Sequence, residues 1–180
     1  YLDLANSLGK FLAKLGPANP DSLRVSYHGE IAEKDTALIS RTTLTGYLEA
    51  ARSEGQVNIV NSPAVAHDMG LELIDSVINA KTEYNELIVA ELTKDGQKFR
   101  VSGTIIGKSP RIVEIDRLFV DTNIKGHFLI VRNDDRPGIV GLVGSSLGEA
   151  GLNIANLSLA RNKTEGDALN IIELDTAPGA

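Results

Sequence analysis

The apolar residues of this chain change their spacing near Leu71. Before that point, two long segments place apolar side chains three and four positions apart, the repeat of a helix with one buried face. After it, apolar and polar residues alternate over several short runs, as in strands with one buried face. This change from helices to strands predicts an α+β fold.

The chain opens within a helix and without a methionine. An apolar stripe is formed by Leu4, Ala5, Leu8, Phe11, Leu12 and Leu15. The segment "GPANPD" at 16–21 then ends the helix with two prolines and a glycine. We therefore expect the sequence to be a piece of a longer protein, with residues 1–20 connecting it to a preceding part.

Four further elements are predicted before Leu71. They are a strand at 22–29, a helix at 35–52 that stops at Gly55, a short strand at 57–60, and a short helix capped by Ser62. Pro63 suits the first position of that last helix because no N–H is required there, and Gly70 suits its end.

The later part of the chain predicts a hairpin and then a domain boundary. Asp95-Gly96 stands between two alternating runs, which is a strong hairpin signal, and "PRIVEIDRLFVD" adds further strands. The polar segment "DTNIKG" at 121–126 follows them. We place the boundary there, which gives a mixed α/β domain at 21–125 and a second domain at 126–180.

The second domain reads as strand, helix, strand, strand. The helix buries Ile139, Val140, Val143, Leu147 and Ala150 and ends at Gly151. The last two strands, "LNIANLSLAR" and "ALNIIELD", are joined by a turn at 163–167. A ferredoxin-like unit is β-α-β-β-α-β, so we expect 126–180 to lack one helix and one strand at its C-terminal end.

Three glycines in that helix, Gly141, Gly144 and Gly148, do not have dinucleotide-loop spacing. They predict close helix packing, and no NAD site is expected in this chain. The three histidines lack metal-ligand spacing, and there is no cysteine, which suits a cytoplasmic protein.

The net charge and the hydropathy of the chain limit the classes of molecule that we expect it to bind. The formal net charge is −6, so the chain has no overall basic field for nucleic acid or an anionic membrane. No apolar run approaches the roughly 20 residues that cross a bilayer. A small molecule or another protein is the expected partner.

The segment "NDDRPGIVG" at 133–141 allows two interpretations. In the first, Asp135 caps the helix and Pro137 lies in its first turn. In the second, the open helix start at Gly138 also binds the carboxylate of a free amino acid while neighbouring Asp or Asn side chains bind its ammonium group. Asn153, which begins the next strand, is expected near the same end of the sheet.

Two resemblances extend these interpretations. "VRNDDRPGIVGLVGSSLGEAGLNIANLSLAR" resembles an ACT domain, an amino-acid-sensing module. "VNIVNSPAVAHDMGLEL", "VSGTIIG" and "RIVEID" resemble the intervening, or allosteric substrate-binding, domain of long-form D-3-phosphoglycerate dehydrogenase. The resemblance implies a homotetrameric NAD-dependent parent enzyme that is inhibited by serine. It also implies that residues 1–20 lead from an absent catalytic part and that this chain has no catalytic site or cofactor.

The same resemblance implies site residues. L-serine would bind where ACT domains of two subunits meet, in contact with Asn133 and Asp135 of one subunit and Asn153 of the other, beside Gly138. In the intervening domain, Arg111 and Arg117 would bind phosphate or phosphoglycerate. The simpler interpretation of both arginines is a solvated charge at a sheet edge.

Two other functions stay open at this point. The β part of iron–sulfur L-serine dehydratase has a similar pair of domains, but it carries a Ser-Ser-His-Thr type segment that is missing here. A freestanding ACT-type regulator is the third possibility. Neighbouring sequence discriminates between them: a G-x-G-x-x-G unit before Tyr1 favours the dehydrogenase, and a cysteine-rich partner favours the dehydratase.

Overall fold

The computed structural model describes residues 1–52, 56–78, 82–162 and 166–179. The chain divides into two compact units, Tyr1–Arg117 and Leu118–Ala180. This division falls before the polar segment 121–126, whereas the sequence pattern placed the boundary after it. The segment groups with the second unit because the Asn123 amide donates to the Glu173 carboxylate, at 2.8 and 3.1 Å from its two oxygens.

No helix in the described ranges is both long and apolar enough to span a membrane.

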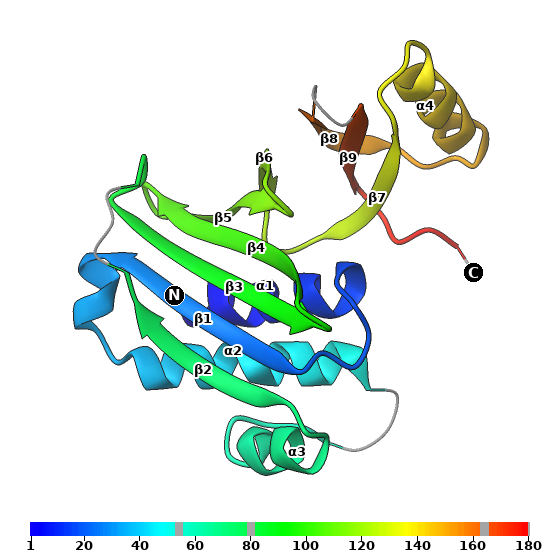
Figure 1. The fold of residues 1–180 in the computed structure, drawn as a ribbon. Helices are drawn as coiled ribbons and strands as arrows, with labels where there is room; N and C mark the ends of the chain where they lie inside the picture. Colours follow the sequence, from blue (N-terminus) through cyan, green and yellow to red (C-terminus); the bar gives the residue numbers. More distant parts are fainter. Residues whose placement is uncertain (53–55, 79–81, 163–165, 180) are drawn as a thin grey trace. The chain divides into compact units, whose positions relative to one another are not determined.

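The first unit is a sheet with helices on one face, as Figure 1 shows. Its elements are α1 (Leu2–Leu15), β1 (Ser22–Gly29), the 3-10 helix η1 (Glu30–Glu33), α2 (Thr36–Ala51), α3 (Ser62–Asp68), β2 (Glu72–Val77), β3 (Glu86–Lys94), β4 (Gln97–Ile106) and β5 (Ser109–Ile115). The larger sheet has the order β2-β1-β3-β4-β5-β6, with β6 at Leu118–Asn123. β1 pairs with β2 in parallel, and β1–β3, β3–β4 and β4–β5 are antiparallel.

The predicted stripe of α1 forms the centre of the first core. Leu4, Leu8 and Leu12 are fully buried, and α1 packs along α2. Two glycines permit this close approach. A Cβ on Gly9 would lie 2.5 Å from the Tyr47 backbone nitrogen, and one on Gly46 would overlap the Asn6 carbonyl.

The strand predicted at 57–60 is wrong, because this segment forms turns. The Asn58 side chain accepts hydrogen bonds from the backbone of Val60 and Asn61, and Asn61 accepts from the Asn58 backbone. Side-chain bonds of this kind replace the backbone pairing of a strand. The helix cap also shifts by one residue: Asn61 is the N-cap of α3, and the buried Ser62 lies inside the helix, where its hydroxyl accepts from Thr45.

The ends of α2 and of the hairpin agree with the sequence pattern. Asp35 caps α2 through the Leu38 N–H, and the helix ends before Arg52. The predicted stop at Gly55 lies outside the described residues. The hairpin turn is confirmed: Asp95 and Gly96 have φ values of 49° and 78° between β3 and β4, the conformation that this dipeptide favours.

The Asp21 carboxylate holds this hairpin in place. It accepts hydrogen bonds from the Asp95 backbone N–H at 2.9 Å and from Lys94 Nζ at 3.2 Å. The first of these, aided by the second, lowers the pKa of Asp21 below its ordinary value. A lowered folded-state pKa contributes stability above the unfolded-state pKa, and that contribution is lost as the pH falls through the folded-state value.

We expect Asp21→Asn to reduce the loss of stability in acid. The variant keeps an acceptor for the Asp95 N–H but no longer titrates, so its free energy of unfolding should fall less steeply than the parent's between about pH 5 and pH 3. Urea unfolding of both proteins across this range measures the slopes. Parallel curves for parent and variant would contradict the prediction.

The second unit contains β7 (His127–Asp134), α4 (Ile139–Glu149), β8 (Ile154–Asn162) and β9 (Asp167–Leu174). Its sheet has the order β7-β9-β8, with both pairings antiparallel, and α4 connects β7 to β8 (Figure 1). This confirms the predicted β-α-β-β sequence and the α+β class. Part of the turn predicted at 163–167 lies outside the described residues.

The core of this unit is small. Leu147, Ile172 and Leu174 form its buried centre, with Leu129, Val143, Leu152 and Ile154 packed around them. Val140, predicted to be buried, is 41% exposed. The three helix glycines do not make the close contacts that were predicted, since a Cβ at Gly141, Gly144 or Gly148 would meet nothing within 4 Å.

Candidate functional site

The start of α4 is formed by a glycine rather than by the predicted acidic cap. Gly138 is the N-cap, in the left-handed conformation (φ 94°, ψ −17°), and no side chain caps the helix. The capping role predicted for Asp135 and the helical position of Pro137 are therefore wrong, because α4 begins only at Ile139. An N-terminus with no side-chain cap keeps backbone N–H groups that an anionic ligand group can accept from.

Asp135 is oriented by Gly166 and Arg161 instead. Its backbone N–H donates to the Gly166 carbonyl at 2.7 Å, and its carboxylate lies 3.3 Å from Arg161 Nε on β8. The Asp135 side chain is 26% exposed and the Arg161 side chain 53%. The carboxylate is thus held at the mouth of the βα turn and stays reachable by a cationic group, which would compete with Arg161 for it.

Asn133 joins a polar pair next to this carboxylate. Its Nδ2 donates to the Asp134 carbonyl at 2.6 Å, and its Oδ1 accepts from Asn170 Nδ2 at 2.8 Å. Asn170 lies on β9 and is only 2% exposed. Sequence reasoning missed both Arg161 and Asn170. The available signal was the alternation of "ALNIIELD", which puts Asn170 on the same face as the buried Ile172 and Leu174.

Asn153 lies at the other end of the sheet, contrary to our expectation. The register aligns Ile154 with Leu174 and His127, and Asn162 with Asp167 and Asp134. β7 and β8 therefore run in the same direction, and α4 carries the chain back to the end where β7 starts. The 11 residues of α4 cover about 16 Å of that return. Within one chain, Asn153 and Asp135 do not share a ligand.

The environment of Asn153 is defined by the residue that follows β9. Its Nδ2 donates to the Asp175 carboxylate, and its carbonyl accepts from the Asp175 N–H at 3.2 Å. These bonds fix the orientation of the Asn153 amide at the surface. The Asn153 Oδ1 atom takes no part in these two bonds and can accept from a further donor.

The two arginines predicted to bind an anion are not brought together. Arg111 is a partly buried residue near the start of β5, paired with Thr104, whereas Arg117 is exposed in the turn that follows β5. About 13 Å of strand lies between Arg111 and the end of β5 at Ile115, and the turn that holds Arg117 follows it. Between them, Glu114 pairs with Arg100 at 2.6 Å, which reduces the positive field along the strand.

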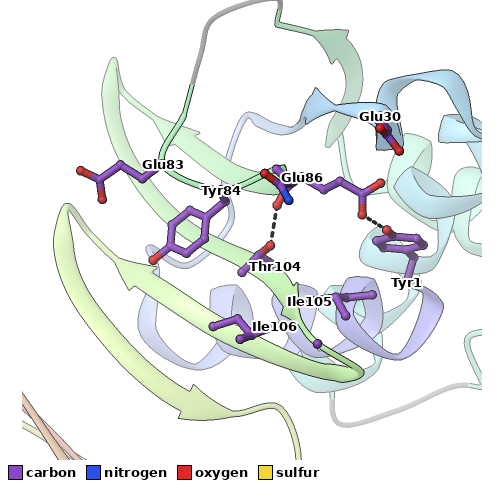
Figure 2. Close-up of a pocket in the computed structure, with 10 residues that line it drawn as sticks. Tyr1, Glu30, Glu83, Tyr84, Glu86, Thr104, Ile105 and Ile106 are labelled. Atoms are coloured by element: carbon purple, nitrogen blue, oxygen red, sulfur yellow. Dashed lines mark hydrogen bonds between the residues drawn. The ribbon is translucent and has the colours of Figure 1, made fainter.

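A separate cavity of 710 Å³ lies at one end of this sheet (Figure 2). Glu30, Glu83 and Glu86 are among its lining residues, and the Tyr1 hydroxyl donates to the Glu86 carboxylate. The described lining contains no lysine or arginine. Three carboxylates without a lysine or arginine among the described lining residues disfavour an anion here, so this cavity does not suit the anion predicted for Arg111.

The fold thus defines a two-unit α+β protein, in which a mixed sheet backed by helices precedes a smaller βαββ unit of the ACT-like kind. Residues 1–116 match the model of the D-3-phosphoglycerate dehydrogenase intervening domain, and the chain belongs to this family.

The relatives of the chain bear a consistent name. It is 31% identical over 175 residues to a D-3-phosphoglycerate dehydrogenase of Methanocaldococcus jannaschii, covering 97% of this chain and 33% of that protein. The proteins of the same name from Bacillus subtilis and Mycobacterium tuberculosis are 28% and 32% identical, with 97% of this chain covered in both alignments and 33% and 34% of those proteins. The chain spans about a third of the length of the curated relatives it matches.

Proposed function

We propose that this chain is the regulatory part of a cytoplasmic, NAD-dependent D-3-phosphoglycerate dehydrogenase and that it binds L-serine as a feedback effector. The ligand lies between the second units of two chains. Asp135 of one chain binds its ammonium group, the open start of α4 at Gly138 binds its carboxylate, and Asn133 lies beside them. Asn153 of the other chain completes the site. The catalytic part and the NAD site belong to the parent protein.

One observation carries this proposal. Asn133 and Asp135 lie at one end of the β7-β9-β8 sheet and Asn153 at the other, although all three have the chemistry of an amino-acid site. A second copy related by a two-fold axis supplies the missing group to each site. The family membership of the first unit supports the same assignment.

Calorimetric titration of the chain with L-serine tests the function directly. We expect saturable binding with one serine per chain, accompanied by an increase in the dimer fraction in sedimentation experiments, because each site needs residues of two chains. D-serine serves as the control ligand, since it presents the same groups with the wrong hand. Serine binding to a strictly monomeric chain would overturn the shared site, and the absence of binding would overturn the function.

For the first unit, we propose that Arg111 contributes to binding of phosphate or phosphoglycerate, independently of Arg117. Because Arg111 lies near the start of β5 and Arg117 lies in the turn after its end, only one of them is expected to contact a given anion within a chain. Arg111→Ala should weaken phosphate binding by roughly three- to tenfold and leave serine affinity unchanged. Arg117→Ala is the matched control with a smaller expected effect. Equal phosphate affinity in parent and Arg111→Ala, measured by calorimetry, would contradict a role of Arg111 in anion binding.

A further inference from the structure

The amide of Asn170 is a buried polar group of the second unit that lies outside the set of residues assigned to the ligand. Asn170 faces the same side of the sheet as Ile172 and Leu174, where apolar side chains pack under α4. Its Nδ2 is bonded to Asn133, but its Oδ1 is buried and has no hydrogen-bond partner among the described residues. An unpaired buried amide oxygen disfavours the folded state relative to an apolar side chain of the same size.

The orientation of this pair follows from its neighbours. The Asp134 carbonyl can only accept, so the Asn133 end that faces it at 2.6 Å must be the Nδ2 group. Asn133 Oδ1 then faces Asn170, which must answer with its own Nδ2. This chain of bonds fixes both amides and leaves Asn170 Oδ1 as the group without a partner.

Fixing the amide determines what Asn133 offers to a ligand. After these two bonds, Asn133 retains one hydrogen on Nδ2 and one lone pair on Oδ1. Asn133 and Asp135 are two positions apart along the chain at the end of β7, beside the open start of α4. With Asp135 assigned to the ligand ammonium and α4 to the ligand carboxylate, Asn133 is left to face the ligand side chain.

We propose that Asn170 is a specificity-determining residue: it holds the Asn133 amide so that the site prefers an amino acid with a small hydroxyl side chain over one with an aliphatic side chain. Asn170 is a positioning residue, because it acts through Asn133. This inference rests on the proposed amino-acid site and adds the origin of its ligand preference. The stability lost by burying the amide is the cost of that preference.

Asn170→Leu in the full 180-residue chain tests the inference with L-serine and L-alanine as paired ligands. The parent should bind serine more tightly than alanine. In the variant, serine affinity should fall roughly two- to tenfold, the range of one neutral hydrogen bond, while alanine affinity stays the same. The melting temperature of the ligand-free variant should equal or exceed the parent's, because the unpaired oxygen is removed.

A double-mutant cycle separates positioning from a general structural role. If Asn170 acts through Asn133, adding Asn170→Leu to Asn133→Ala should cause no further loss of serine affinity. The Asn133 side-chain amide signal in a nitrogen–proton spectrum should shift with serine and much less with alanine. Equal losses for both ligands, unchanged serine affinity, or additive losses in the cycle would overturn the inference and leave the amino-acid site intact. A parent that binds neither ligand would overturn the proposed function itself.

Discussion

Gly9→Ala should destabilise the first unit by about 1 to 2 kcal/mol, although alanine is the better helix former. The added methyl group would lie 2.5 Å from the Tyr47 backbone nitrogen and closer still to the Thr43 carbonyl oxygen. Both contacts are backbone atoms of α2, so no side-chain rotation relieves them and the helices must move apart. Overpacking of this kind typically costs about 1–3 kcal/mol, and the gain of up to about 1 kcal/mol from helix propensity offsets only part of it.

Urea unfolding followed by near-ultraviolet circular dichroism of tyrosine measures this effect. All four tyrosines, Tyr1, Tyr27, Tyr47 and Tyr84, belong to the first unit and the chain has no tryptophan, so the signal reports on that unit. Gly148→Ala in α4 is the matched control, because its methyl group would meet nothing within 4 Å. It should leave the tyrosine transition unchanged. A Gly9→Ala variant as stable as the parent would show that the two helices can separate freely.

Asp135→Asn and Asn153→Ala should each weaken serine binding by roughly ten- to a hundredfold, and mixing the two variants should restore part of it. The first change removes the charge that binds the ligand ammonium, a loss of about 1.5–3 kcal/mol for a charged hydrogen bond. Because Asp135 makes no capping bond to α4, asparagine at this position leaves the start of the helix unchanged. The second change removes the amide that the proposal assigns to the other chain.

The mixture distinguishes a shared site from two independent losses. In a pair made of one chain of each variant, one site combines the intact Asp135 with the intact Asn153 and the other site has neither. Random pairing therefore restores the parental affinity in about a quarter of the sites, after the chains have been allowed to exchange. Titration calorimetry of the mixture should show this tight fraction. Its absence, with both single variants folded and dimeric, would contradict a site built from two chains.

The predicted elements succeeded where a local signal acted alone. The α1 stripe, the helix predicted at 35–52 and the Asp95-Gly96 turn each depend on residues close together in the chain, and all are present. The strand predicted at 57–60 does not form, because the side chains of two asparagines accept hydrogen bonds from the backbone N–H groups of this segment. The Asp135 cap failed because Arg161, more than twenty positions away, competes for the same carboxylate.

The candidate site likewise has features that the sequence predicted and features that depended on the tertiary structure. Asn133, Asp135, Gly138 and Asn153 could be proposed from the sequence because of the polar chemistry around the helix start and the resemblance to an ACT domain. Their separation could not, since it depends on the direction in which α4 returns the chain and on the register of β8 against β9. Asn170 was missed for a related reason. The alternation of its strand places it on the same face as Ile172 and Leu174, but it does not reveal that the Asn170 amide will contact Asn133 on β7.

By itself, the sequence determined most of the element types, the central hairpin and the choice of residues that we propose for an amino-acid site, because these follow from side-chain chemistry, from short motifs and from periodicities of a few residues. Only the tertiary structure decided that Gly9 and Gly46 allow α1 and α2 to touch, that Asp135 pairs with Arg161, and that Asn153 faces away from Asp135. Each of these depends on atoms far apart in the chain, whose contact is set by packing and strand register rather than by any neighbour in sequence.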